Sequence, residues 1–312
     1  MSITPLAQPF RGIAFKLASV CVFVCMAALI KAVSDHVPPG QAVFFRSFFA
    51  MPVIVVWLLL RGELRHGLET KQPLGHFWRG LVGTTAMGLG FAGLGLLPLP
   101  EVTAIGYAAP LLTVIFAAMF LNEEVRAFRL TAVAIGLIGV VIVLSPRLSI
   151  GAGPMDARET LGAVVVLGGA AFAALAQVFV RKLVATEGTA AIVFWFSVTA
   201  TLLSLLSLPW GWVVPTSVEA LMLVGAGLCG GLGQILLTSS YRFADASVVA
   251  PFEYASMILA IGVGYFVFGE VPTWITISGA AIIIAAGVLI IWRERQLGLE
   301  RAKQRKAMGL GN

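Results

Sequence analysis

The chain has 312 residues, of which 59% are hydrophobic and only 12% charged, with a mean hydropathy of +0.97 and a formal net charge of +6. Soluble proteins carry about 25% charged residues, so this composition excludes an ordinary soluble domain. The apolar runs are continuous, whereas a spanning β-barrel would alternate apolar and polar residues. The sequence therefore predicts an all-α integral membrane protein.

Ten apolar runs follow one another along the chain, each close to the roughly 20 residues that cross the hydrocarbon core as a helix. They lie near residues 12–32, 40–60, 78–97, 101–120, 128–146, 161–181, 190–208, 219–241, 246–268 and 273–292. The first run, preceded by Arg11 and followed by Ala32-Val33-Ser34, could also be a cleavable signal peptide. The repeat described below needs this run as a helix, so ten transmembrane helices are expected.

The distribution of basic residues predicts the orientation, because Lys and Arg in short loops favour the cytoplasm. With the N-terminus inside, the outer segments hold Lys31, Arg147 and Arg158, and Arg46 lies within a span. The inner segments hold the other 17 of the 21 basic residues, which are Arg11, Lys16, Arg61, Arg65, Lys71, Arg79, Arg126, Arg129, Arg181, Lys182, Arg242, Arg293, Arg295, Arg301, Lys303, Arg305 and Lys306. Both termini are thus expected in the cytoplasm, with residues 293–312 as a basic tail. The net charge is explained by topology and anionic lipid headgroups, not by nucleic acid.

Two sequence blocks recur in the same order in the two halves of the chain. FLNEEV (120–125) matches FVFGEV (266–271) at an offset of 146, and GIAFKLASV…LIK (12–31) matches residues 162–181 at an offset of 150. The repeats are predicted at 11–147 and 160–292. Each holds five spans, an odd number, so the second repeat enters the membrane inverted. Inverted repeats are typical of secondary transporters, whose solute site lies at mid-depth between them.

The ordered motifs resemble a known family. Ten spans as five plus five, Arg46 in VFFRSFF, and spans ending in NEEV and FGEV are similar to the EamA branch of the drug/metabolite transporter superfamily, over about residues 11–292. The resemblance implies a bacterial inner-membrane carrier of small organic solutes with a central cavity. APFEY (250–254), after SSYRFADASVV, is similar to a subgroup that includes riboflavin and S-adenosylmethionine carriers.

Two ionisable residues, Arg46 and Glu253, lie well inside predicted spans, where charges usually face a cavity or a partner. Each is about seven residues from a span end, on opposite faces, so they are either two poles of one cavity or an ion pair that needs a broken helix. Neither is duplicated, since Arg46 aligns with Phe196 and Glu253 with Tyr107. Burial favours the protonated form of a carboxylate, which makes Glu253 the candidate for proton coupling. A purely structural ion pair remains the alternative.

Prolines point to the same two spans. Pro251 and Pro110 should each kink a helix and free a backbone carbonyl, which is tolerated where the helix lines a polar cavity. Packing kinks without a ligand are the alternative. The predicted cavity residues are Arg46, Tyr107, Pro110, Gln177, Trp195, Gln234, Pro251, Glu253 and Tyr254. The two glutamines could equally bridge helices and the aromatics could equally pack. Glu124 and Glu270 are expected to cap the helices that follow them.

Other function classes fit less well. No metal or cofactor is expected, because Cys21 and Cys25 are too few for a metal site and the three histidines fall in loops. A membrane enzyme lacks a catalytic constellation, a channel would need a ring of like groups, and a non-transporting receptor or scaffold does not need an inverted repeat. The expected partners are a small-molecule solute and membrane lipids, with the chain a monomer or a homodimer. A zwitterion would suit two opposite charges, and a planar heterocycle would suit the aromatic residues.

Overall fold

The computed structural model describes residues 9–121, 127–147, 154–184, 186–244 and 246–307, and within these ranges it contains helices and no strand. Eight helical stretches are long and apolar enough to cross a membrane. The shorter apolar helix α10, Thr189–Leu205, and the 22-residue helix α5, Pro73–Leu94, complete the series. Together these ten segments match the ten predicted runs, so the molecule is an all-α multi-pass membrane protein.

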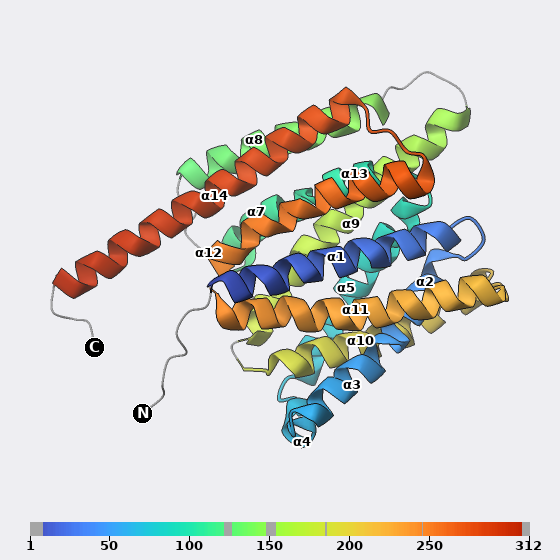
Figure 1. Ribbon diagram of the computed structural model, residues 1–312, viewed down its shortest axis with the longest axis horizontal. Helices are drawn as coiled ribbons and strands as arrows, with labels where there is room; N and C mark the ends of the chain where they lie inside the picture. Colours follow the sequence, from blue (N-terminus) through green and yellow to red (C-terminus); the bar gives the residue numbers. More distant parts are fainter. Residues whose placement is uncertain (1–8, 122–126, 148–153, 185, 245, 308–312) are drawn as a thin grey trace.

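The first half of the chain contains α1 to α8 (Figure 1). Their bounds are α1 Pro9–Val33, α2 Pro39–Phe48, α3 Ala50–Leu60, α4 Leu64–Gly67, α5 Pro73–Leu94, α6 Leu99–Gly106, α7 Ala108–Leu121 and α8 Ala127–Leu144, with the 3₁₀ turn η1 at Ser145–Arg147. The second half contains α9 Pro154–Val184, α10, η2 Leu208–Trp210, α11 Ser217–Phe243, α12 Ala246–Val249, η3 Ala250–Tyr254, α13 Ala255–Phe268 and α14 Trp274–Ala307. The first turn of α1 and the last turn of α14 lie at the same end of the molecule in Figure 1.

Helices that correspond in the two repeats make matching contacts. Helix α1 packs along α11 while its equivalent, α9, packs along α5, the equivalent of α11. The remaining equivalents pack on each other, α2 on α10, α6 on α13 and α8 on α14. A pseudo-twofold relation between inverted halves requires this pattern, so the fold is two inverted five-helix repeats that interlock through their first and third spans.

Glycines bring the backbones together at these symmetric contacts. A Cβ at Gly227 of α11 would lie 2.8 Å from the carbonyl oxygen of Phe45 on α2. In the other repeat, a Cβ at Gly80 of α5 would lie 2.6 Å from Cβ of Thr199 on α10. Small residues of this kind allow close helix packing in membranes. The glycines of the third and eighth spans thus seat these helices against the broken second span and its equivalent.

Three spans are interrupted beside prolines. Pro52 and Pro110 lack the N–H that would bond to the carbonyls of Phe48 and Gly106, and α2 and α6 end at those residues. Pro251 lies in η3, where five residues form a 3₁₀ turn between α12 and α13. The interruptions lie in the second, fourth and ninth spans, so prolines open the backbone of the helices that surround the centre of the bundle.

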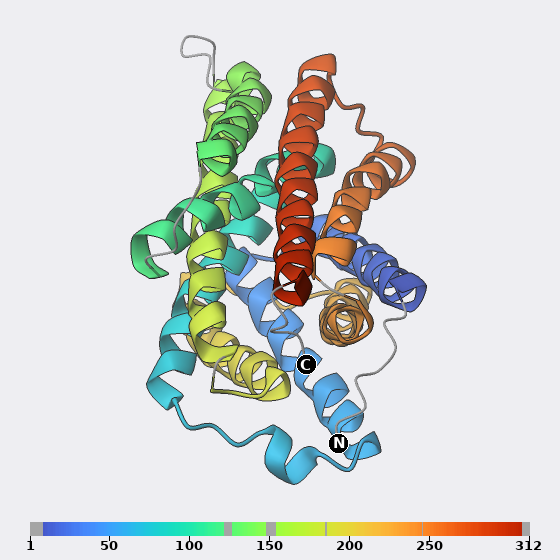
Figure 2. The ribbon, with the colours of Figure 1, turned by 90° about the vertical axis from the view of Figure 1, so that its left-hand side faces the viewer.

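Two apolar clusters hold the bundle together. One joins α6, α7, α8, α9, α13 and α14 and includes Leu111, Val140, Val166 and Ile283. The other joins α1, α2, α5, α6, α11 and α13. The α8–α14 pair forms one edge of the molecule and α4 lies at the opposite edge, as Figure 2 also shows. Helices α6 and α13 contribute to both clusters and therefore connect the two sides.

Candidate solute-binding site

Two arginines meet beside one phenylalanine in the middle of the bundle. Arg46, on α2, is only 4% exposed, and its Cζ lies 5.9 Å from the ring centroid of Phe196 on α10. Arg79, on α5, places its Cζ 3.7 Å from the same centroid. The two guanidinium groups are close enough to repel each other. These three residues, called the arginine cluster below, bring two like charges from the first repeat against the second.

Glycines make the room for this cluster. A Cβ at Gly83 would clash with Nη1 of Arg79 and lie 2.9 Å from Cε2 of Phe196. A Cβ at Gly230 of α11 would lie 2.9 Å from Nε of Arg46. Arg46 and Phe196 occupy equivalent positions of the two repeats, so the cluster sits where the halves meet.

The positive charge of the cluster is not neutralised by any neighbour that the structure describes. Nε of Arg46 and both Nε and Nη1 of Arg79 are buried and have no hydrogen-bond partner among the described residues. A charge at mid-bilayer costs at least about 2.5 kcal/mol, whereas a cation–π contact contributes about 0.5–2 kcal/mol. Because the two cations share one ring and repel each other, the burial of both arginines carries a net free-energy cost.

The acidic residue of the centre has its own partner. Lys16, on α1, donates a charged hydrogen bond from Nζ to Oε2 of Glu253 in η3. The pair is asymmetric, because the Lys16 side chain is 3% exposed and that of Glu253 is 47% exposed. Glu253 thus meets a lysine rather than Arg46, and the two predicted charges belong to separate clusters.

The tyrosines predicted to line the centre lie together next to this ion pair. The rings of Tyr107 and Tyr254 meet edge to face, with centroids 5.1 Å apart, and the Tyr107 hydroxyl lies 2.6 Å from the hydroxyl of Ser256. Pro251 is partly buried in the same 3₁₀ turn as Tyr254, whereas Pro110, in the first turn of α7, is exposed. Tyr107 follows α6 and Tyr254 ends η3, so the contact between their rings shows that the breaks of the fourth and ninth spans face each other.

The other three predicted cavity residues lie elsewhere. Trp195 donates its indole N–H to the carbonyl of Leu68, 3.0 Å away in the segment between α4 and α5. Gln234 lines a small hollow with Ile54 and Trp57, between α3, α10 and α11. Gln177 is exposed on α9. No contact given for the described residues joins these three side chains to Arg46, Arg79 or the Lys16–Glu253 pair.

Two residues of the centre were missed by sequence reasoning. Lys16 and Arg79 were counted among the cytoplasmic basic residues, because each lies within a few residues of a predicted span end. Lys16 nevertheless falls within the run 12–32 and Arg79 within 78–97, and that position was the available signal. A long basic side chain can therefore reach the interior even when its residue lies within one helical turn of the span end.

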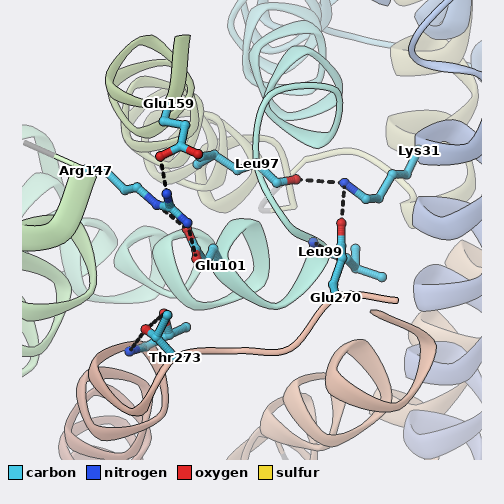
Figure 3. A network of polar contacts seen from close by, with 9 residues as sticks. Lys31, Leu97, Leu99, Glu101, Arg147, Glu159, Glu270 and Thr273 are labelled. Atoms are coloured by element: carbon cyan, nitrogen blue, oxygen red, sulfur yellow. Dashed lines mark hydrogen bonds and ion pairs between the residues drawn. The ribbon is translucent and has the colours of Figure 1, made fainter. Parts of the chain in front are cut away.

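One end of the bundle is closed by ion pairs between the repeats (Figure 3). Lys31 on α1 pairs with Oε1 of Glu270 at 2.9 Å and donates to the carbonyls of Leu94 and Leu97. Oε2 of Glu270 accepts the N–H of Leu99 at 2.8 Å, at the start of α6. The expectation that Glu270 caps the helix after it is wrong, because Thr273 fills that role through the N–H of Thr276. Glu124 lies outside the described residues.

A second ion cluster adjoins the first. Arg147 in η1 forms two hydrogen bonds to the carboxylate of Glu101 on α6, at 3.0 and 2.8 Å, and also pairs with Glu159 on α9. Figure 3 shows this arginine between the two acids, with the Lys31–Glu270 pair beside Leu99 at the start of α6. Arg158 donates to the carbonyl of Gly95 nearby. Lys31, Arg147 and Arg158, the three basic residues expected in the outer segments, thus lie together at this one end.

Another carboxylate joins the halves in the connections before α5 and α10. Oε1 of Glu187 accepts the N–H groups of Lys71 and Gln72 at 2.7 and 2.8 Å, and Oε2 lies 3.6 Å from His76. Burial alone would raise the pKa of Glu187, but these N–H donors and His76 outweigh it and lower the pKa below the ordinary value. The carboxylate stays charged and ties the start of α5 to the second repeat.

Comparison with known proteins matches this architecture to a family. The model of the EamA-like transporter family matches the chain twice, over residues 10–145 and 160–292. The chain belongs to this family. A solved crystal structure superposes with a TM-score of 0.65, covering 92% of this chain and 98% of that one, and at 21% identity it shows the fold alone.

Named relatives cover nearly the whole chain. The S-adenosylmethionine uptake transporter of Rickettsia bellii (strain RML369-C) is 29% identical over 285 residues, which are 91% of this chain and 94% of the relative. The pseudopaline exporter CntI of Pseudomonas aeruginosa (strain UCBPP-PA14) is 28% identical over 281 residues, 89% of this chain and 95% of the relative. One relative is named for uptake and the other for export, so membrane transport of a small metabolite is the property they share.

Proposed function

We propose that this protein is a secondary transporter that carries a small polar organic metabolite across the bacterial inner membrane by alternating access. The observation that carries the proposal is the pairing of equivalent helices across the two inverted repeats, with α1 on α11 and α9 on α5. Such a scaffold has two arrangements, related by exchanging the conformations of the two repeats, and each is open to one side. The family match and the transporter relatives support the same reading.

We propose residues 11–147 and 160–292 as the two functional halves, with both termini in the cytoplasm and 293–312 as a basic tail. The gathering of Lys31, Arg147 and Arg158 at one end supports this orientation, since the other end then holds most of the basic residues. Reporter fusions at the C-terminus and in the α1–α2 connection test it. A cytoplasmic reporter active at the C-terminus and silent after α1 is expected, and the reverse would contradict the orientation.

The substrate proposal follows the relatives and the sequence. An amino-acid-like metabolite or S-adenosylmethionine is the first candidate, in keeping with the relative from Rickettsia bellii, and a riboflavin-like heterocycle is the second, suited to the rings of Tyr107 and Tyr254. The test is uptake of labelled S-adenosylmethionine and riboflavin by proteoliposomes that contain the purified protein. Transport of either solute above empty vesicles supports the carrier, and vesicles that move no solute would support a receptor or scaffold.

We further propose that the Lys16–Glu253 pair couples transport to protons. The carboxylate is half exposed and its partner is buried, so protonation of Glu253 would leave the buried ammonium group of Lys16 without a negative partner. Glu253→Gln tests this in proteoliposomes with an imposed proton gradient. The variant should lose gradient-driven accumulation while it keeps downhill exchange, and full accumulation that a protonophore still abolishes would refute the coupling role.

A further inference from the structure

The arginine cluster has features of a binding site that is incomplete within the protein. Arg46 is 4% exposed, its Nε has no hydrogen-bond partner among the described residues, and the same holds for Nε and Nη1 of Arg79. Structural arginines buried in membranes are normally paired with acids or backbone carbonyls. Two such residues side by side, repelling each other, indicate that a negative group binds between them at some stage of the cycle.

The central acid and the acids that join the two repeats already have partners among the described residues. Glu253 is held by Lys16, and the acids of Figure 3 are held by Lys31 and Arg147. Glu187 is held by the N–H groups of Lys71 and Gln72 and by His76. None of these described acids supplies the negative group, so we take it to be a ligand from outside the chain.

The position of the cluster fits a transported solute rather than a lipid headgroup. Arg46 lies about seven residues from one end of its span, roughly 10 Å deep, and Arg79 reaches the same Phe196 ring from the second turn of α5. Phe196, on the other repeat, lies against both. A ligand held there contacts both halves, which is where alternating access places its solute.

We propose that Arg46 and Arg79 form a carboxylate-binding site and that the solute presents a carboxylate to it. This proposal rests on the proposed function only in treating the anion as the transported solute. The guanidinium group is a planar fork that binds a carboxylate through two parallel hydrogen bonds, which a spherical anion cannot match. Two guanidinium groups beside one ring would select solutes with at least one carboxylate and reject amines that lack one.

The anion site can be tested without knowing the solute. Purified protein in detergent is melted with increasing sodium acetate, with acetamide as the neutral isostere, and with sodium chloride at the same ionic strength. A ligand that binds only the folded state raises the melting temperature as its concentration exceeds its dissociation constant. Acetate should stabilise the wild-type protein more than either of the other two. Equal stabilisation by chloride would overturn carboxylate selectivity, and no difference between acetate and acetamide would overturn the site.

Variants then assign the effect to the cluster. Arg46→Gln and Arg79→Gln should each weaken acetate binding by about tenfold or more, the loss of one charged hydrogen-bonding partner. Arg61→Gln is the matched control, because Arg61 also stacks on an aromatic ring, that of Trp57 at 4.9 Å, but lies at the surface. Lysine variants at 46 and 79 keep the charge and should retain part of the binding if the glutamine variants fail to fold. An unchanged acetate response in Arg46→Gln and Arg79→Gln would refute the assignment.

Transport separates this proposal from the function on which it rests. If carboxylate binding depends on the cluster but the protein moves no solute, the binding site is supported and the transporter function is refuted. If Arg46→Gln and Arg79→Gln transport the solute with an unchanged Michaelis constant, the transporter function is supported and the binding site is refuted. A raised Michaelis constant in both variants, with none in Arg61→Gln, is the expected result.

Discussion

The Lys16–Glu253 pair makes an asymmetric prediction, because only one of its members is buried. Glu253→Gln removes the partner of a lysine whose side chain is 3% exposed. Leaving an uncompensated buried charge costs about 3–5 kcal/mol, and the half exposure of Glu253 reduces the loss toward the lower end through solvent screening. Lys16→Met instead leaves a half-exposed carboxylate, which the proposed function places at an aqueous cavity, so its cost should be about 1 kcal/mol.

The assay is thermal unfolding in detergent, followed by tryptophan fluorescence. With the usual entropy of unfolding per residue, about 1 kcal/mol shifts the melting temperature of a 312-residue chain by about 1.5 °C, so Glu253→Gln should lower it by about 5 °C and Lys16→Met by about 1.5 °C. The double variant Lys16→Met/Glu253→Gln should recover most of the loss, since no unpaired charge remains. Glu63→Gln breaks the exposed pair with Arg61 and is the control, with an expected cost under about 1 kcal/mol. Equal losses in the two single variants, or a double variant worse than Glu253→Gln, would refute the reasoning.

Three further predictions concern the other polar clusters. Arg46→Met should raise the melting temperature of the ligand-free protein by about 1–3 °C, because it removes an uncompensated buried charge. Glu187→Gln should destabilise the protein at pH 7. The difference in stability should vanish as the pH falls below 4.5 and through the lowered pKa of the folded state, because a carboxylate with a depressed pKa stabilises the fold only while it is ionised. Glu270→Gln breaks the ion pair with Lys31 and should speed maleimide labelling of a cysteine placed at the buried Ala104.

Each of these has a result that would contradict it. A lower melting temperature in ligand-free Arg46→Met would mean that the charge is compensated within the protein. A pH-independent effect of Glu187→Gln would assign its role to packing. The labelling experiment uses a background in which Cys21, Cys25 and Cys229 are replaced, and equal rates with Glu63→Gln as control would show that the ion pair does not hold that end closed.

The ten spans and their duplication could be predicted from the sequence, because hydropathy and repeat spacing are local properties. The run 246–268 gave one span, and Pro251 marked the place where its helix breaks. Likewise Pro110 marked the break between α6 and α7. A proline changes the backbone wherever it lies, so its effect does not depend on distant neighbours.

The partners of the charged residues could not be predicted in the same way. Lys16 and Glu253 are separated by 237 positions, and they meet only because α1 packs beside η3 in the interlocked fold. Charge counting assigned Lys16 and Arg79 to the cytoplasm because both lie near span ends, and their positions just inside the apolar runs were not enough to identify their partners. The same limit explains Glu270, whose carboxylate bonds to α6 rather than to the helix that follows it.

The most direct test of the account is solute exchange by the purified protein in proteoliposomes. Vesicles preloaded with an unlabelled carboxylated metabolite should take up the labelled form faster than unloaded vesicles, because a carrier with one mid-membrane site returns more quickly when it is loaded. Trans-stimulation in the wild type that is lost in Arg79→Gln is the predicted result. A panel of carboxylated metabolites that shows no exchange above protein-free vesicles would contradict the account.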